Sequence, residues 1–140
     1  MNTDELFKKR LLKKISIDLN KVRNSIKIAE NKLERAKKLF SSDFFQEAFV
    51  SAYTSIFHSS RALLYKQGIQ EKSHFAVYSY IKNKFSSLIP KKLIEAFSNY
   101  QLERHNIFYG FESEISKNKA ENIILDAEEF LEKIQEILNK

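Results

Sequence analysis

Cysteine is absent from this sequence of 140 residues, and glycine and proline are scarce, with two glycines and one proline. The absence of cysteine excludes disulfides, thiolate catalysis and cysteine-ligated metal sites. Glycine and proline make up about 7% and 5% of an average protein, and a sheet protein needs such residues for its turns. Their scarcity therefore predicts an all-α protein.

Long apolar runs are also missing. No stretch approaches the roughly 20 apolar residues of a membrane-spanning helix, and the first residues, MNTDELFKKRLLKK, contain no apolar run of signal-peptide length. The length allows one domain with a hydrophobic core but not two comfortable ones. We therefore expect one domain over residues 1–140, in a cytoplasmic protein without membrane contact.

The formal net charge of +6 is unevenly distributed along the chain. Residues 1–40 contain twelve Lys and Arg against five Asp and Glu, whereas residues 111–140 contain four against eight. Such a pattern is expected where a basic and an acidic helix attract each other in a bundle. It also fits a basic surface that binds nucleic acid, and composition leaves both interpretations open.

Apolar residues from Leu12 to Phe40 recur at alternating spacings of three and four residues. This heptad spacing predicts one helix over residues 12–40, about 43 Å long. The segment SSD that follows provides a stop and, at Asp43, a new N-cap.

Four further helices are expected. Gly68 ends a second helix that starts at Phe44, a third covers about residues 74–86, and Pro90 opens a fourth that closes at Gly110. A fifth follows the polar segment SEISKNKA. The expected fold is an up-and-down bundle of about five helices without a sheet.

The second helix has an unusual surface, because small residues alternate with large aromatic ones. Small side chains let another backbone approach closely, and there are more of them than one internal face can use. We therefore predict a homodimer in which this helix meets a second subunit through Ser51, Ser55, His58 and Ser59. A two-fold contact there would place both copies of the segment RHNIFYG beside one cleft.

Residue spacing does not support several kinds of site. The three histidines, His58, His74 and His105, lie far apart in the sequence, and the one Glu-x-x-His spacing, Glu71 to His74, crosses a predicted loop. Di-metal bundles need two such pairs with further carboxylates, so no metal or cofactor is expected. No Ser-His-acid set emerges, and two isolated glycines cannot form a phosphate-binding loop.

The segment RHNIFYG carries three adjacent groups that can bind anions or move protons, Arg104, His105 and Asn106. On a helix Arg104 and Phe108 share a face, Tyr109 returns within reach one turn on, and His105 diverges from Arg104 by about 100°. Arg104 can therefore point into a groove while His105 faces elsewhere. The spacing also fits an ordinary helix end whose cations are favoured by the helix dipole.

Several segments form an ordered pattern: AYTSIFHSSRALL over 52–64, then Gly68, KSH over 72–74, and RHNIFYG over 104–110. This pattern resembles the small prokaryotic HEPN domains, in which A-Y-Y-A-x-F-H-A-A-R-A-L-L precedes a K-G turn, a K-S/T-H step and a later R-x-x-A-D-Y-G. The resemblance covers about residues 18–138. It implies a bundle of four to five helices, usually a homodimer, often paired with a minimal nucleotidyltransferase in a toxin–antitoxin arrangement.

The resemblance also implies a chemistry. Active members are metal-independent ribonucleases that use an arginine followed, after four to six residues, by a histidine; the arginine binds the phosphate and the histidine transfers a proton. Counted from Arg104, that histidine would fall at Tyr109, Gly110 or Phe111, and none of these is histidine. Tyrosine, with a pKa of about 10 in peptides, is a poor base at pH 7. Arg104, Asn106 and Tyr109 thus resemble a phosphate-binding site without its catalytic histidine.

We therefore expect a HEPN-type protein that binds nucleotide or RNA with little or no cleavage, as part of a module with a minimal nucleotidyltransferase. Two alternatives remain open. The first is an active endoribonuclease with Arg104 and either His105 or Tyr109 as catalytic residues. The second is a structural adaptor without a role in nucleic-acid binding.

Overall fold

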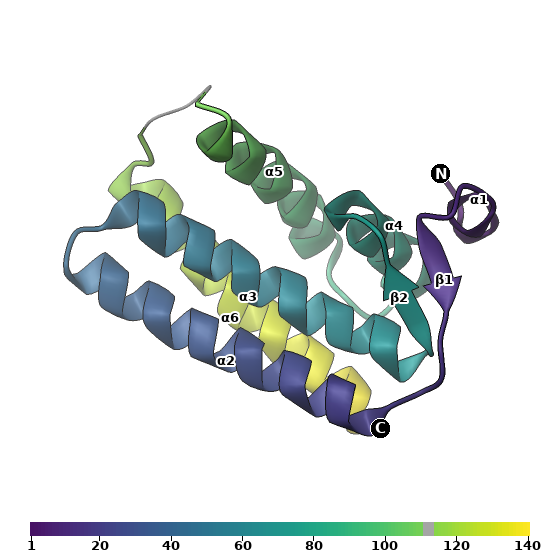
Figure 1. The fold of residues 1–140 in the computed structure, drawn as a ribbon. Helices are drawn as coiled ribbons and strands as arrows, with labels where there is room; N and C mark the ends of the chain where they lie inside the picture. Colours follow the sequence, from purple (N-terminus) through teal and green to yellow (C-terminus); the bar gives the residue numbers. More distant parts are fainter. Residues whose placement is uncertain (111–113) are drawn as a thin grey trace.

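The computed structural model describes residues 1–110 and 114–140, which form a bundle around one central helix (Figure 1). The central helix, α3 (Phe45–Lys66), packs along α2 (Leu19–Ser41) and α6 (Lys117–Leu138). Two shorter helices, α4 (His74–Phe85) and α5 (Lys91–Phe108), lie beside it. The prediction of an all-α bundle is confirmed, and the helices expected after the first one are found close to their predicted bounds.

One continuous core joins these elements. Leu6, Phe49, Phe97 and Phe130, which come from four different helices, are each at most 1% exposed and belong to one cluster. Within the described ranges, no helix combines the length and the apolar character that crossing a lipid bilayer requires.

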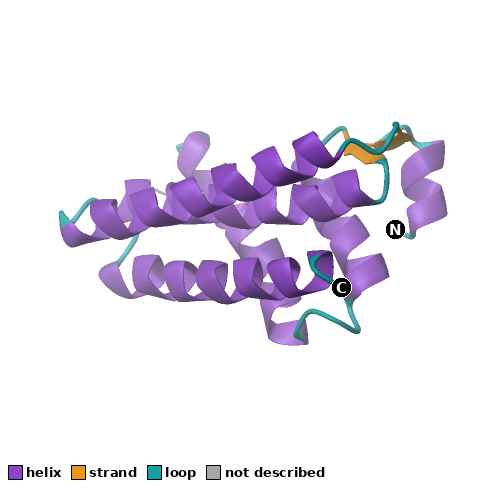
Figure 2. Ribbon diagram, turned by 90° about the horizontal axis from the view of Figure 1, so that it is seen from below, coloured by secondary structure: helices purple, strands orange, loops and turns teal. Residues whose placement is uncertain are grey.

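The N-terminal part departs from the expected long helix. A short helix, α1 (Thr3–Lys8), is followed by a strand, β1 (Leu12–Lys14), which pairs antiparallel with β2 (Ile69–Glu71). Figure 2 shows this strand pair at the end of the bundle near the N-terminus. The predictions of a helix starting at Leu12 and of a fold without any sheet are therefore wrong here.

Long-range backbone pairing explains the difference. Leu12 lies in β1 and is buried in the core, and the amide of Ile15 donates a hydrogen bond to the carbonyl oxygen of Gly68 at 2.9 Å. Helix α2 begins only after Asp18, whose carboxylate accepts a hydrogen bond from the amide of Asn20. Because the partner strand lies far along the chain, the local apolar spacing around Leu12 does not indicate that this segment forms a strand and not a helix.

Helices α2 and α3 pack closely because small residues meet between them. The buried hydroxyls of Ser51 and Ser55 donate hydrogen bonds of 2.8 Å to the α2 carbonyl oxygens of Lys32 and Ala29. Ser59, also buried, donates to a carbonyl oxygen of its own helix. The structure therefore corrects the expectation that these three serines meet a second subunit: their side chains are enclosed within the chain, where buried hydroxyls need acceptors.

Of the three helix-end predictions at Asp43, Gly68 and Gly110, the two at the glycines are confirmed and the one at Asp43 is wrong. Asp43 does not cap α3; it adopts a positive φ of 63°, and Phe44 precedes the helix without a side-chain cap. Gly68 follows α3 with a φ of +70°, and a Cβ there would lie 2.9 Å from the carbonyl oxygen of Ile15. Gly110 follows α5 with a φ of +74°. Glycine is favoured at both positions because a positive φ strains other residues.

Candidate functional site

A groove of about 620 Å³ opens between the start of α4 and the C-terminal half of α5. Arg104 and His105 line it from α5, and His74, the first residue of α4, lines it from the other side. Ser98 and Asn99 add polar side chains to the α5 wall. We call this the Arg104 groove.

Two aromatic rings position Arg104. The central carbon of its guanidinium lies 5.7 Å from the centre of the Tyr53 ring and 4.6 Å from the centre of the Phe108 ring. The prediction that Arg104 and Phe108 share a helix face is confirmed. Arg104 forms no ion pair with a carboxylate in the described part of the chain. Since aromatic faces attract a cation without neutralising it, the charge of Arg104 can act on an anion in the groove.

His74 is held by residues of α3. Its Nδ1 shares a hydrogen bond of 2.9 Å with the hydroxyl of the buried Tyr53, and its ring stacks on Phe57 with 4.1 Å between ring centres. Burial, with the positive charge of Arg104 as the next cause, lowers the pKa of His74 to about 4. Burial also raises the pKa of Tyr53 above its ordinary value, against the opposing effect of Arg104. Both side chains are therefore neutral at pH 7, with fixed orientations.

Sequence reasoning does not single out Tyr53 and His74 as site residues. Both lie in segments that carry the family resemblance, AYTSIFH and KSH, and that is the signal that could have found them. Their position beside Arg104 depends on how α3, α4 and α5 pack against one another. Residue spacing along one helix does not predict this packing.

His105 and Tyr109 differ from their expected positions. His105 lines the groove together with Arg104 and does not face away from it. The reason is that the groove follows the stripe of Ser98, Gln101 and His105, which share one face of α5, while Arg104 lies at its edge. Tyr109 packs on His105, with 4.4 Å between ring centres, and the ring that Arg104 contacts one turn on is that of Phe108.

The remaining positions of the segment do not join the groove. Asn106 is half-buried and diverges from Arg104 by about 200° around the helix, so the structure does not bring it beside Arg104. Phe111, the third position at which a matching histidine would fall, lies outside the described residues. Within residues 1–110 and 114–140, no group of three or more His, Asp or Glu is arranged to hold a metal ion.

Farther along α3, His58 and Arg61 add charge-bearing groups. Arg61 donates from Nε to Oε1 of Glu71 at 3.0 Å, which compensates its charge. His58 is half-buried, and its Nδ1 is enclosed without a hydrogen-bond partner among the described residues. Burial, followed by the charges of Arg61 and Lys32, lowers the pKa of His58. The expectation that His58 contacts a second subunit stays a prediction.

Comparison with known proteins gives consistent matches. The sequence pattern described as the HEPN domain matches residues 22–137. A Methanocaldococcus jannaschii protein named "Putative toxin" is 32% identical over 125 residues, which cover 82% of this chain and 87% of the relative. A "UPF0332 protein" of Archaeoglobus fulgidus is 31% identical over 120 residues, covering 82% and 93%. A second M. jannaschii "Putative toxin" is 29% identical over 115 residues, covering 81% and 78%.

Proposed function

The chain belongs to the HEPN domain family, and we propose that it is a toxin-type member that binds RNA or nucleotide phosphates in the Arg104 groove and cleaves RNA weakly or not at all. The names of two relatives support the toxin role. Residues 1–140 act as one domain in this proposal, because a continuous core joins Leu6 of α1 to Ile134 of α6.

The observation that carries the proposal is the cation of Arg104, which has no carboxylate partner among the described residues and is held over two rings at the edge of a groove that His74 also lines. A guanidinium binds phosphate strongly, because charge-assisted hydrogen bonds exceed neutral ones. When the Tyr53 hydroxyl donates to Nδ1 of His74, Nε2 carries the ring proton and can donate to a phosphate oxygen. We therefore assign the phosphate contact to Arg104 and His74 in place of Asn106, while the 67% exposed Tyr109 offers a ring to a base.

Arg104→Ala tests the proposal. Binding of a fluorescent single-stranded RNA, followed by anisotropy, should weaken by about 1.5–3 kcal/mol, the usual scale for hydrogen bonds to a charged group. Wild-type binding should also fall as salt is raised, because phosphate contacts release counterions. Lys91→Ala, which removes a well-exposed cation from the other end of the same helix, is the matched control and should change little. RNA binding that Arg104→Ala leaves intact would contradict the assignment of the phosphate contact to Arg104, and a wild-type protein that binds no RNA would leave the structural-adaptor function.

A second candidate is an active endoribonuclease, and one observation favours it. His105 lines the same groove as Arg104, so an arginine and a histidine do face one ligand site, although their spacing differs from that of active family members. In that function His105 would transfer the proton and Arg104 would stabilise the phosphate charge. RNA cleavage that His105→Ala abolishes, with binding retained, would establish this candidate over the binding protein.

The proposal also includes a homodimer and a minimal nucleotidyltransferase partner. Because the three serines of α3 are enclosed, a dimer needs another contact, and Leu102, which lines the Arg104 groove with 61% of its surface exposed, is the residue we assign to it. Sedimentation at micromolar concentration should show a dimer of the wild-type protein, and Leu102→Glu should weaken this dimer. A wild-type protein that sediments as a monomer would contradict a cleft shared between two subunits.

Co-expression with a nucleotidyltransferase encoded next to this chain should give a complex that survives gel filtration.

A further inference from the structure

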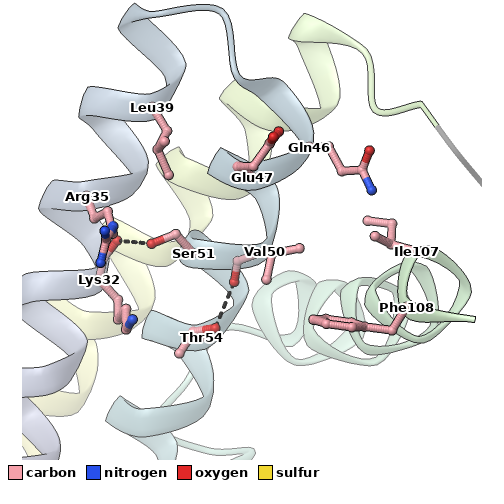
Figure 3. Close-up of a pocket in the computed structure, with 10 residues that line it drawn as sticks. All are labelled: Lys32, Arg35, Leu39, Gln46, Glu47, Val50, Ser51, Thr54, Ile107 and Phe108. Atoms are coloured by element: carbon pink, nitrogen blue, oxygen red, sulfur yellow. Dashed lines mark hydrogen bonds between the residues drawn. The ribbon is translucent and has the colours of Figure 1, made fainter.

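Phe108 lines a second groove besides contacting Arg104. This groove, of about 560 Å³, crosses the outer surface of α3 between α2 and the C-terminal end of α5 (Figure 3). Lys32 and Arg35 approach it from α2, and Ile107 and Phe108 approach it from α5. We call it the Arg35 groove.

The two basic residues are the cationic groups in this groove that are available to an anion. Neither Lys32 nor Arg35 forms an ion pair within the described residues. The hydroxyls are already used by the fold, since Ser51 donates to a carbonyl oxygen of α2 and Thr54 donates to one of its own helix, each at 2.8 Å. Glu47 brings one negative charge, so the residues that line the groove have a net charge of +1.

Phe108 connects this groove with the Arg104 groove. Its side chain is 59% exposed, lines the Arg35 groove, and lies under the guanidinium of Arg104 at 4.6 Å from the ring centre. An exposed ring flanked by cations is the arrangement with which proteins hold single strands, because bases stack on the ring and the cations follow the phosphates. A duplex cannot use such a ring, since its bases are already stacked on each other.

We propose that the Arg35 groove is a second nucleotide subsite, continuous with the first, so that the ligand is a single-stranded RNA of at least two nucleotides. Arg104 binds one phosphate, Phe108 stacks on a base, and the chain continues across Val50 and Thr54 toward Lys32 and Arg35. The volume of the Arg35 groove lies within the usual range for small-ligand sites, about 300–1,000 Å³. This inference rests on the proposed function and specifies the length and form of its ligand.

A competition experiment tests the inference. A labelled eight-nucleotide 2′-O-methyl RNA, which cannot be cleaved through a 2′-hydroxyl, is displaced by an unlabelled nucleoside monophosphate, by unlabelled 2′-O-methyl RNAs of two to eight nucleotides, or by an RNA duplex. Lys32→Ala/Arg35→Ala is compared with Lys27→Ala/Lys38→Ala, which removes the same charge from α2 at positions that do not line the groove. Circular dichroism confirms that both variants fold.

We expect the eight-nucleotide strand to bind at least about tenfold more tightly than the monophosphate, because a second subsite adds stacking and ionic contacts. Lys32→Ala/Arg35→Ala should remove that advantage and leave monophosphate binding unchanged. It should also reduce the slope of log affinity against log salt by about 1.4, at about 0.7 for each lost phosphate contact with a single strand. The control variant should keep both the advantage and the slope.

The outcomes separate this inference from the proposed function. Binding that depends on Arg104 but not on strand length would overturn the second subsite alone. Equal losses in the two double variants would show diffuse attraction and would also overturn it, as would a changed oligomeric state of Lys32→Ala/Arg35→Ala with unchanged RNA affinity. If no strand, duplex or monophosphate binds, the proposed function itself fails.

Discussion

The two sides of α3 use the same helix in opposite ways. Toward α2, small serine and alanine side chains bring two backbones close enough for Ser51 and Ser55 to reach carbonyl oxygens of the neighbouring helix. Toward α4 and α5, the large rings of Tyr53 and Phe57 hold His74 and Arg104 at a groove that is open to solvent. The residues that alternate in the sequence thus separate in space into a packing face and a ligand face.

This separation has an energetic meaning. The packing face is buried, and the hydroxyls of Ser51 and Ser55 are hydrogen-bonded, so a change there acts on the free energy of unfolding. The groove beside the ligand face carries the exposed ring of Phe108 and the cation of Arg104, which has no carboxylate partner among the described residues. A change to either of these two side chains should act on binding and leave stability nearly intact.

Ser55→Leu should produce the largest effect. Ser55 is fully buried against α2, so a larger side chain must push the helices apart while the hydrogen bond to Ala29 is lost. We expect a loss of about 3 kcal/mol or more in the free energy of unfolding, measured with urea. Ser55→Ala keeps the small volume and should cost only about 1 kcal/mol. Equal effects of the two substitutions would contradict close packing at this face.

Gly68→Ala should come next, and Gly110→Ala is its counterpart at the end of the helix that carries Arg104. Both glycines have a positive φ, which costs other residues roughly 1–2 kcal/mol. At Gly68 the new Cβ would also lie 2.9 Å from a backbone oxygen, whereas at Gly110 it would meet no described atom within 4 Å. We expect losses of about 2–3 and about 1 kcal/mol, respectively, in urea unfolding. A reversed order would contradict the close approach of Ile15 to Gly68.

His74 should make stability depend on pH. Its pKa of about 4 in the folded protein lies below the value near 6.5 of an unfolded chain, so the unfolded state binds a proton first as pH falls. The stabilising effect of neutral His74 is therefore complete above pH 6.5 and is lost as pH falls toward 4. The ring is only half-buried, so we expect about 1 kcal/mol over this range, less than its pKa alone would imply.

The measurement is the difference in unfolding free energy between wild type and His74→Leu, taken at several pH values. Subtraction removes the contributions of His58 and of the carboxylates. A difference that does not change between pH 6.5 and 4 would show that His74 titrates normally, and the fixed neutral ring beside Arg104 would have to be abandoned.

Phe108→Ala should have the smallest effect on stability. Since Phe108 is 59% exposed, we expect a change within about 0.5 kcal/mol in urea unfolding, even though a large ring is removed. Phe97→Ala on the same helix, where the ring is fully buried, is the control and should cost about 3–5 kcal/mol. A large loss for Phe108→Ala would mean that this ring belongs to the core and not to the exposed wall of the Arg35 groove.

Much of the bundle could be predicted because its signals are local. Apolar spacing and the two glycines located α3, α4, α5 and α6 within a few residues, and Arg104 was correctly paired with Phe108. The strand at Leu12 could not be found in this way, because its partner, Glu71, lies far along the chain.

The candidate site was only partly predictable for a similar reason. Arg104 could be named from one segment, but His74 and Tyr53 meet it only when three helices pack together. The serines of α3 were assigned to a subunit contact because a small residue indicates a close neighbour. The sequence does not show whether that neighbour is a helix of the same chain or of a second subunit. The prediction of Asp43 as an N-cap was wrong because aspartate, a good capping residue, can also adopt the left-handed conformation of a turn.

The strand pair has a consequence for the order of folding. Helices α2 and α3 are joined by a short turn and can form a helical hairpin from local contacts, whereas β1 must find a partner 59 residues away, from Leu12 to Glu71. Closing so long a loop costs entropy before any contact rewards it, so contacts of this kind form slowly. During synthesis β1 must therefore wait until β2 has left the ribosome, while the hairpin of α2 and α3 can already be in place.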